Sequence, residues 1–254
     1  MSSYSRRGVT VTINPPEEKK RRNWVAESIA ALLSVALIEL IWPDFIPFSY
    51  FELWGIKEGT VLDWLQAGVP VFIWGAALAA LYSIFTRNNP KVNARAEQHF
   101  VAGAFTSLRA GIFEEIGFRW ILFMNGIVVV EITNYFLGGF AGLTGLTKWL
   151  HLHFFGPIAN GFTLGYLEEY LVKPEVWYLG AAILVTNAFF RDGHKYQGFV
   201  GWVNSWFGGM YLFWIMFQFG LPAAILVHFV YNFIIDVVRY VDMVAERKFD
   251  LARA

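Results

Sequence analysis

Long apolar runs separated by short polar segments are the dominant pattern along the chain. A helix needs about 20 predominantly apolar residues to cross the hydrocarbon core of a bilayer. Seven runs approach or reach this length, at about 24–42, 63–86, 97–112, 113–137, 176–190, 199–219 and 221–240, and an eighth, weaker run covers about 154–172. The pattern therefore predicts an all-α, polytopic transmembrane bundle of about eight helices, with six as the alternative.

The composition supports a membrane protein rather than a soluble one. Of the 254 residues, 56% are hydrophobic and 16% are charged, whereas soluble domains carry about 25% charged residues. We expect an integral, multi-pass protein of the cytoplasmic (inner) membrane of a prokaryote or of an equivalent organelle membrane. The formal net charge of zero gives no reason to expect a nucleic-acid partner. The absence of cysteine excludes disulfides, thiolate metal sites and cysteine nucleophiles.

Basic residues are concentrated in three segments, at 1–23, 87–95 and 239–253. The positive-inside rule places such segments on the cytoplasmic side, which predicts that both termini are cytoplasmic and that an even number of spans lies between consecutive segments. We divide the chain into a polar basic N-terminal tail (1–23), a transmembrane domain (24–240) and a cytoplasmic C-terminal tail (241–254).

The apolar run that begins near residue 113 contains two carboxylates and a guanidinium. Ionisable groups inside a membrane are costly and require a partner or a function. Glu115 and Arg119 lie four residues apart, so they share a helix face and can form an ion pair. Glu114 points about 100° away from Glu115 and lacks that partner. The pattern fits a general base beside a structural ion pair, or a helix-locking pair with a spare carboxylate at a water-filled cavity.

Two further apolar runs carry polar residues at a spacing of four. Phe190 and His194 form one pair, and His228 and Asn232 form the other. A histidine at a helix end is often a capping residue, and a His–Asn pair can simply join two helices. Together with Glu114, however, these side chains could activate a water molecule and stabilise an oxyanion.

The ordered motifs Glu114-Glu115-x-x-x-Arg119, Phe190-x-x-x-His194 and His228-x-x-x-Asn232 resemble those of the CPBP family. These are the CAAX-protease and bacteriocin-processing intramembrane proteases, also called the Abi family, which includes the Rce1-like prenyl-protein endopeptidases. The resemblance covers about residues 97–240. It implies a helical membrane bundle whose active site opens toward the cytoplasm.

The resemblance also implies roles for individual residues. Glu114 corresponds to the water-activating glutamate, and His194 to the histidine that holds this water. His228 and Asn232 correspond to the pair on the oxyanion side. Glu115, Arg119 and Phe190 occupy motif positions with supporting, structural roles.

No cofactor is expected, because the resemblance favours a glutamate mechanism without metal and the chain lacks a His-Glu-x-x-His motif. The alternative is a zinc ion held by Glu114, His194 and His228, with one coordination position open.

The chain departs from the family pattern in the region between the first two motifs. His194 lies 80 residues after Glu114, and the extra residues form an insert-like region at 138–176. His151 and His153 in this insert compete for the second-motif role. Neither follows a Phe at a distance of four, and Pro157 should break the local helix, so we expect an interfacial loop with solvated histidines. Two smaller departures are Arg191-Asp192 inside the second motif and Trp120 after the first.

The sequence therefore predicts a CPBP-type intramembrane endopeptidase that cleaves a peptide bond near the cytoplasmic membrane face. Its expected partners are membrane lipids and a membrane-associated peptide or protein substrate. The alternative is a non-proteolytic subunit or scaffold of a larger membrane complex, which the long insert and the aromatic composition favour. A proton-coupled transporter is disfavoured because we see no inverted repeat. The sequence does not identify the substrate or the oligomeric state.

Overall fold

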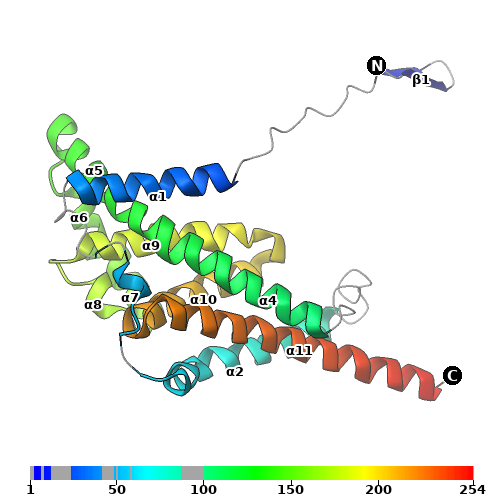
Figure 1. Cartoon of the computed structure of the whole chain (residues 1–254). Helices are drawn as coiled ribbons and strands as arrows, with labels where there is room; N and C mark the ends of the chain where they lie inside the picture. The colour runs from blue at the N-terminus through cyan, green and yellow to red at the C-terminus, as the bar shows by residue number, and fades with distance from the viewer. Residues whose placement is uncertain are drawn as a thin grey trace.

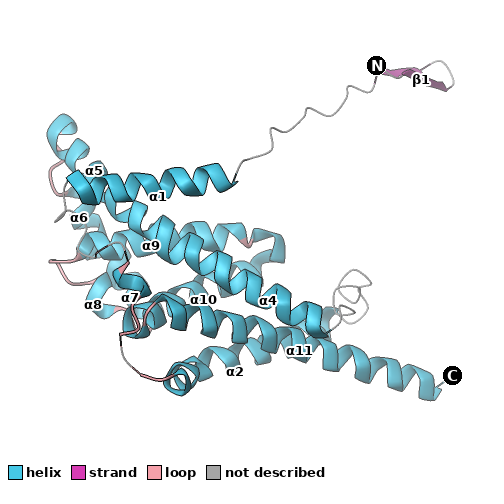
Figure 2. Cartoon of the chain, in the orientation of Figure 1, coloured by secondary structure: helices cyan, strands magenta, loops and turns pink. Residues whose placement is uncertain are grey.

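The computed structural model describes residues 3–6, 9–12, 24–41, 49, 51–57, 59–86 and 100–253. Most of the N-terminal tail and the basic segment 87–95 lie outside these residues. Apart from a short antiparallel hairpin of β1 (Ser3–Arg6) and β2 (Val9–Thr12), the described chain is helical (Figure 2). The predicted all-helical class is therefore confirmed for the transmembrane domain.

The long helices follow the predicted apolar runs closely (Figure 1). They are α1 (Trp24–Ile41), α2 (Val61–Thr86), α4 (Phe100–Glu114), α5 (Phe123–Ala141), α9 (Trp177–Gly193), α10 (Gly198–Phe219) and α11 (Leu221–Arg253). A short 3-10 helix η1 (Glu52–Trp54) precedes α2, and another, η4 (Lys195–Gln197), joins α9 to α10.

The runs at 97–112 and 113–137 form one continuous rod rather than two separate spans. A π-helical segment η2 (Glu115–Leu122) joins α4 directly to α5. The rod is uninterrupted because this stretch contains no proline and its charged side chains find partners inside the bundle. Within the described part of the chain, three helices are long and apolar enough to cross a membrane, at Val61–Tyr82, Ala102–Ala141 and Leu221–Asp242.

The insert-like region contains helices that are too short to cross a membrane. α6 (Leu146–Leu150), η3 (His151–Phe155) and α7 (Gly156–Phe162) follow one another without interruption, and a turn separates them from α8 (Glu168–Leu171). Leu164 in this turn has a φ of 53°, in the left-handed region. The weak run at 154–172 is therefore divided and forms no single span.

The expectation of a loop with solvated histidines in the insert was wrong in two respects. Pro157 lies in the first turn of α7 and follows the π-helical turn η3, where its missing N–H is tolerated. His151 is buried, and its Nε2 lies 2.9 Å from the Leu171 carbonyl oxygen. Only His153 is exposed, stacked on Trp149.

Helix α11 is packed between α2 and α4, α10 joins it to α9, and α9 packs against α5. The contact with α4 is close at Gly111, where an added Cβ would lie 3.1 Å from the Ile225 carbonyl oxygen and 3.2 Å from the Phe229 nitrogen. The centre of the bundle is filled by large apolar side chains such as Phe123, Ile183 and Phe213. This packing fixes α4, α9 and α11, which carry the three motifs.

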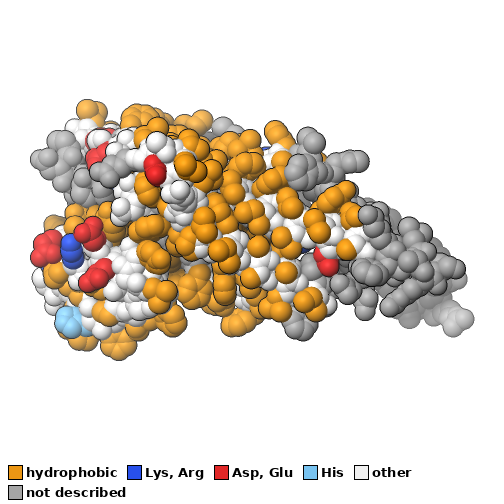
Figure 3. Space-filling model, turned by 90° about the horizontal axis from the view of Figure 1, so that it is seen from below, with side chains coloured by type: hydrophobic (Ala, Val, Ile, Leu, Met, Phe, Trp, Pro, Cys, Tyr) orange, Lys and Arg blue, Asp and Glu red, His pale blue; other side chains and the backbone are white. Residues whose placement is uncertain are grey.

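The beginning of α1, the end of α2, the beginning of α4 and the end of α11 all lie at one end of the bundle (Figure 1). The turn between α9 and α10 points toward the same end. Figure 3 shows a face whose middle is covered by hydrophobic side chains, as a lipid-facing surface requires. The exposed charged side chains of α8 and the following turn, Glu168, Glu169, Lys173 and Glu175, lie at the opposite end.

Candidate active site

The widened turn η2 places the first motif inside the bundle. Glu115 and Arg119 are fully buried, and Arg119 Nη1 donates a hydrogen bond of 2.9 Å to Glu115 Oε1. The Arg119 guanidinium also lies over the Phe190 ring, 4.0 Å from its centroid. The ion pair predicted from the spacing is therefore present. π-helical turns occur often at functional sites, since they redirect side chains within a helix.

Helix α11 is tied to this ion pair through His228. His228 Nδ1 lies 2.6 Å from Glu115 Oε1. Because a carboxylate oxygen accepts hydrogen bonds, the Nδ1 atom carries the hydrogen and donates a hydrogen bond to Glu115. Glu115 Oε1 thus accepts hydrogen bonds from both Arg119 and His228. The Nε2 atom of His228 lies on the opposite side of the imidazole ring from this contact.

His194 is oriented by the end of its own helix. Its Nδ1 lies 2.8 Å from the Phe190 carbonyl oxygen, to which it donates a hydrogen bond. The Phe190 ring tilts against the His194 imidazole, with centroids 4.6 Å apart. In the neutral imidazole this tautomer leaves Nε2 as a hydrogen-bond acceptor.

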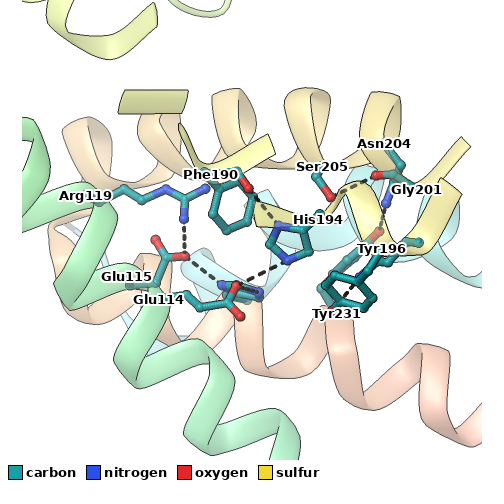
Figure 4. Close-up of polar contacts among 12 residues, drawn as sticks. Glu114, Glu115, Arg119, Phe190, His194, Tyr196, Gly201, Asn204, Ser205 and Tyr231 are labelled. Carbon is teal, nitrogen blue, oxygen red and sulfur yellow. Dashed lines mark hydrogen bonds and ion pairs between the residues drawn. The ribbon is translucent and has the colours of Figure 1, made fainter. Parts of the chain in front are cut away.

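Glu114 lies where the two histidines meet. Its Oε2 atom is 3.7 Å from His194 Nε2 and 3.8 Å from His228 Nε2. This oxygen is buried and has no hydrogen-bond partner among the described residues. The separations are too long for direct hydrogen bonds, and polar contacts of this length are commonly bridged by water. The arrangement can hold one water molecule against a carboxylate and an imidazole (Figure 4).

Asn232 is half-buried on α11, one turn after His228. Within the described part of the chain, no hydrogen bond or ion pair links it to Glu114, His194 or His228. The structure thus brings together Glu114, His194 and His228, with Glu115, Arg119 and Phe190 in support. The oxyanion role of Asn232 stays a prediction.

The two smaller departures from the family pattern each have a packing explanation. Trp120 is buried against η1 and stacks edge-on against Trp54, with centroids 5.2 Å apart. Asp192 accepts a hydrogen bond of 2.9 Å from Arg191 Nε and another of 2.9 Å from Trp202 Nε1. The Arg191-Asp192 pair therefore anchors the end of α9 to α10.

Sequence reasoning missed a polar residue behind the first motif. Asn187 is fully buried in α9 and donates a hydrogen bond of 2.9 Å to the Trp206 carbonyl oxygen. A Cβ added at Gly209 would lie 1.9 Å from Asn187 Oδ1 and 3.0 Å from Arg119 Nη2. The only available signal was an amide residue in an apolar run, seven residues before His194.

A metal centre is not preformed in the described residues, where no three His, Asp or Glu side chains are grouped closely enough to hold an ion. Glu114, His194 and His228 would have to approach one another to bind zinc.

The family model for Rce1-like proteins, described as type II CAAX prenyl endopeptidase Rce1-like, matches residues 96–234. The chain belongs to this family. The match contains all three motifs and includes the insert-like region, and it confirms the resemblance seen in the sequence. No curated protein and no solved structure matches the chain. Membership in a family of membrane proteases and the three apolar helices together indicate an integral membrane protein.

Proposed function

We propose that the protein is an intramembrane endopeptidase in which Glu114 activates a water molecule. The observation that carries this proposal is the convergence of Glu114 Oε2 with the Nε2 atoms of His194 and His228, at 3.7 and 3.8 Å. Three separate helical segments supply these atoms, and second hydrogen bonds fix both imidazoles. A carboxylate positioned in this way is suited to general-base catalysis.

In the proposed reaction, a water molecule lies between Glu114 and His194. Glu114 accepts a proton from this water as its oxygen attacks the scissile carbonyl carbon. The resulting oxyanion is stabilised on the His228 side, with Asn232 as a second donor. In its protonated form His228 donates Nδ1–H to Glu115 and Nε2–H into the site. Glu114 then transfers its proton to the leaving amine, which completes hydrolysis of the peptide bond.

We further propose that cleavage occurs near the cytoplasmic face of the membrane. The ends of α1, α2, α4 and α11 that adjoin the three basic segments lie at one end of the bundle (Figure 1). The positive-inside rule assigns that end to the cytoplasm. The turn that carries His194 points the same way, so a substrate can reach the site from that side. Lipids and a membrane-associated peptide or protein remain the proposed partners.

A prenylated peptide that ends in a CAAX sequence is the first substrate to test, since the family description names this class. We expect purified protein in liposomes to cut a fluorescence-quenched peptide of this type, and mass spectrometry to identify a single cleaved bond. Absence of cleavage of this peptide and of unprenylated membrane peptides would contradict the proposal.

The alternative function is a non-proteolytic subunit or scaffold of a larger membrane complex. It is favoured by the exposed aromatic side chains at the insert and the end of α5, including Phe136, Phe140, Trp149 and Phe154. A stoichiometric partner after purification in mild detergent, together with no hydrolysis by the complex, would support this alternative.

A further inference from the structure

A second polar cluster joins three helices of the bundle and takes no part in the catalytic network. Trp74 of α2 donates its indole N–H to Asn204 Oδ1 of α10 over 2.9 Å. Asn204 Nδ2 in turn donates to the Tyr231 hydroxyl oxygen of α11 over 2.8 Å. Three helices thus contribute to one hydrogen-bonded chain, which begins at the exposed Trp74 and continues to the half-buried Asn204 and Tyr231.

This cluster is next to the catalytic residues. Tyr231 follows His228 by three residues, a spacing that places side chains on neighbouring positions of a helix surface. In Figure 4, Asn204 and Tyr231 lie on one side of His194, and Arg119 and Glu115 lie on the other. Gly75 makes room for the Tyr231 ring, since an added Cβ would be 2.5 Å from it.

The cluster retains hydrogen-bonding capacity that its internal contacts do not use. Tyr231 accepts from Asn204 through its oxygen, so its hydroxyl proton is available to a further acceptor. The Asn204 amide has a second N–H and a second lone pair on Oδ1. In the catalytic network, Glu115 Oε1 and His194 Nδ1 already take part in hydrogen bonds.

An extended peptide bound at an intramembrane site needs hydrogen-bond donors and acceptors from the protein. Its backbone N–H and C=O groups lose their water, and a group left without a hydrogen-bond partner in an apolar medium weakens binding. A side-chain amide can pair with both groups of a peptide unit, and a tyrosine hydroxyl can donate to a carbonyl oxygen.

We propose that Asn204 and Tyr231 form a subsite that binds the peptide backbone of the substrate beside the scissile bond. This inference rests on the proposed protease function and adds the residues that hold the substrate. Trp74 is a positioning residue in it, because its indole fixes the orientation of the Asn204 amide.

The test is the variant Tyr231→Phe, which removes the hydroxyl and keeps the ring against Gly75. We expect KM for the prenylated CAAX peptide to rise roughly three- to tenfold, as for the loss of one neutral hydrogen bond. The value of kcat and the pH profile should stay unchanged. The lost hydrogen bond would stabilise the bound substrate and the transition state equally, so its loss weakens binding without slowing the chemical step.

Tyr211→Phe is the matched control. The Tyr211 hydroxyl also joins α10 to α2, by donating to the Ala67 carbonyl oxygen, and it makes no contact with the catalytic residues. Both variants lose one interhelical hydrogen bond, so both should show a similar change in thermal stability, and only Tyr231→Phe should raise KM. An unchanged KM in Tyr231→Phe, or equal changes in both variants, would show that the cluster only joins helices and would overturn the proposal.

Binding of the same peptide to Glu114→Gln protein separates this inference from the proposed function. We expect the Glu114→Gln protein to bind the peptide, and the double variant Glu114→Gln/Tyr231→Phe to bind it more weakly. If the wild type cleaves the peptide but the single and the double variant bind it equally well, the subsite proposal alone would be overturned. No cleavage and no binding would overturn the subsite together with the protease function.

Discussion

Replacing Arg119 by methionine tests whether the buried ion pair maintains the active-site network. Arg119 and Glu115 are both fully buried and joined at 2.9 Å, and Glu115 also binds His228 at 2.6 Å. The variant leaves Glu115 as a buried charge without its cationic partner. Breaking a buried pair in this way costs about 3–5 kcal/mol. Loss of the contact with the Phe190 ring adds about 0.5–2 kcal/mol.

The free energy of unfolding should be measured by denaturant titration in mild detergent, with helical content as the signal. The double variant Arg119→Met/Glu115→Gln should be more stable than Arg119→Met, because it removes the uncompensated charge. Lys173→Met is the control: this side chain is 52% exposed and pairs with Glu169 at 3.4 Å, so the loss should be at most about 1 kcal/mol. A cost for Arg119→Met no larger than for Lys173→Met would refute the reasoning.

Three further predictions follow from the packing and the site. Gly209→Ala should destabilise the fold and abolish cleavage, because its Cβ would lie 1.9 Å from Asn187 Oδ1. Gly208→Ala is the control and should be tolerated, because the space around its Cβ is open. The thermal stability and the cleavage rate of both variants test this prediction. Burial lowers the pKa of His151 below its usual 6.5, so its contribution to stability is present above that pH and is lost as the pH falls. The melting temperature of the wild type should therefore drop more than that of His151→Gln between about pH 8 and about pH 5.5, and equal drops would contradict the assignment. Zinc chelation should leave the cleavage rate unchanged, and a loss of rate that added zinc restores would favour the three-ligand alternative.

Hydrophobic length was sufficient to predict most of the long helices, and motif spacing was sufficient to predict the buried ion pair. The Glu115–Arg119 pair follows from a spacing of four, and the approach of Glu114, His194 and His228 follows from the family resemblance. These features depend on local periodicity and on residue types that are costly in an apolar helix.

Other features depend on tertiary contacts, which a single sequence does not reveal. The sequence divides the apolar run at residues 112–113, whereas in the structure the helix continues through η2 and Glu115 accepts a hydrogen bond from His228 of α11. The burial of His151 could not be predicted, because its partner, the Leu171 carbonyl oxygen, lies 20 residues away in the sequence. The hydrogen bond from Asn187 to Trp206 likewise joins two helices, and the amide alone did not indicate it.

The comparison of wild-type protein with Glu114→Gln tests the central claim most directly. The substitution keeps the size of the side chain and removes its ability to accept a proton from water. The rate of peptide cleavage in liposomes should fall by at least about 100-fold, the lower end of what a general base contributes, while the melting temperature stays close to that of the wild type. A Glu114→Gln protein that cleaves the same bond at the wild-type rate would contradict the account.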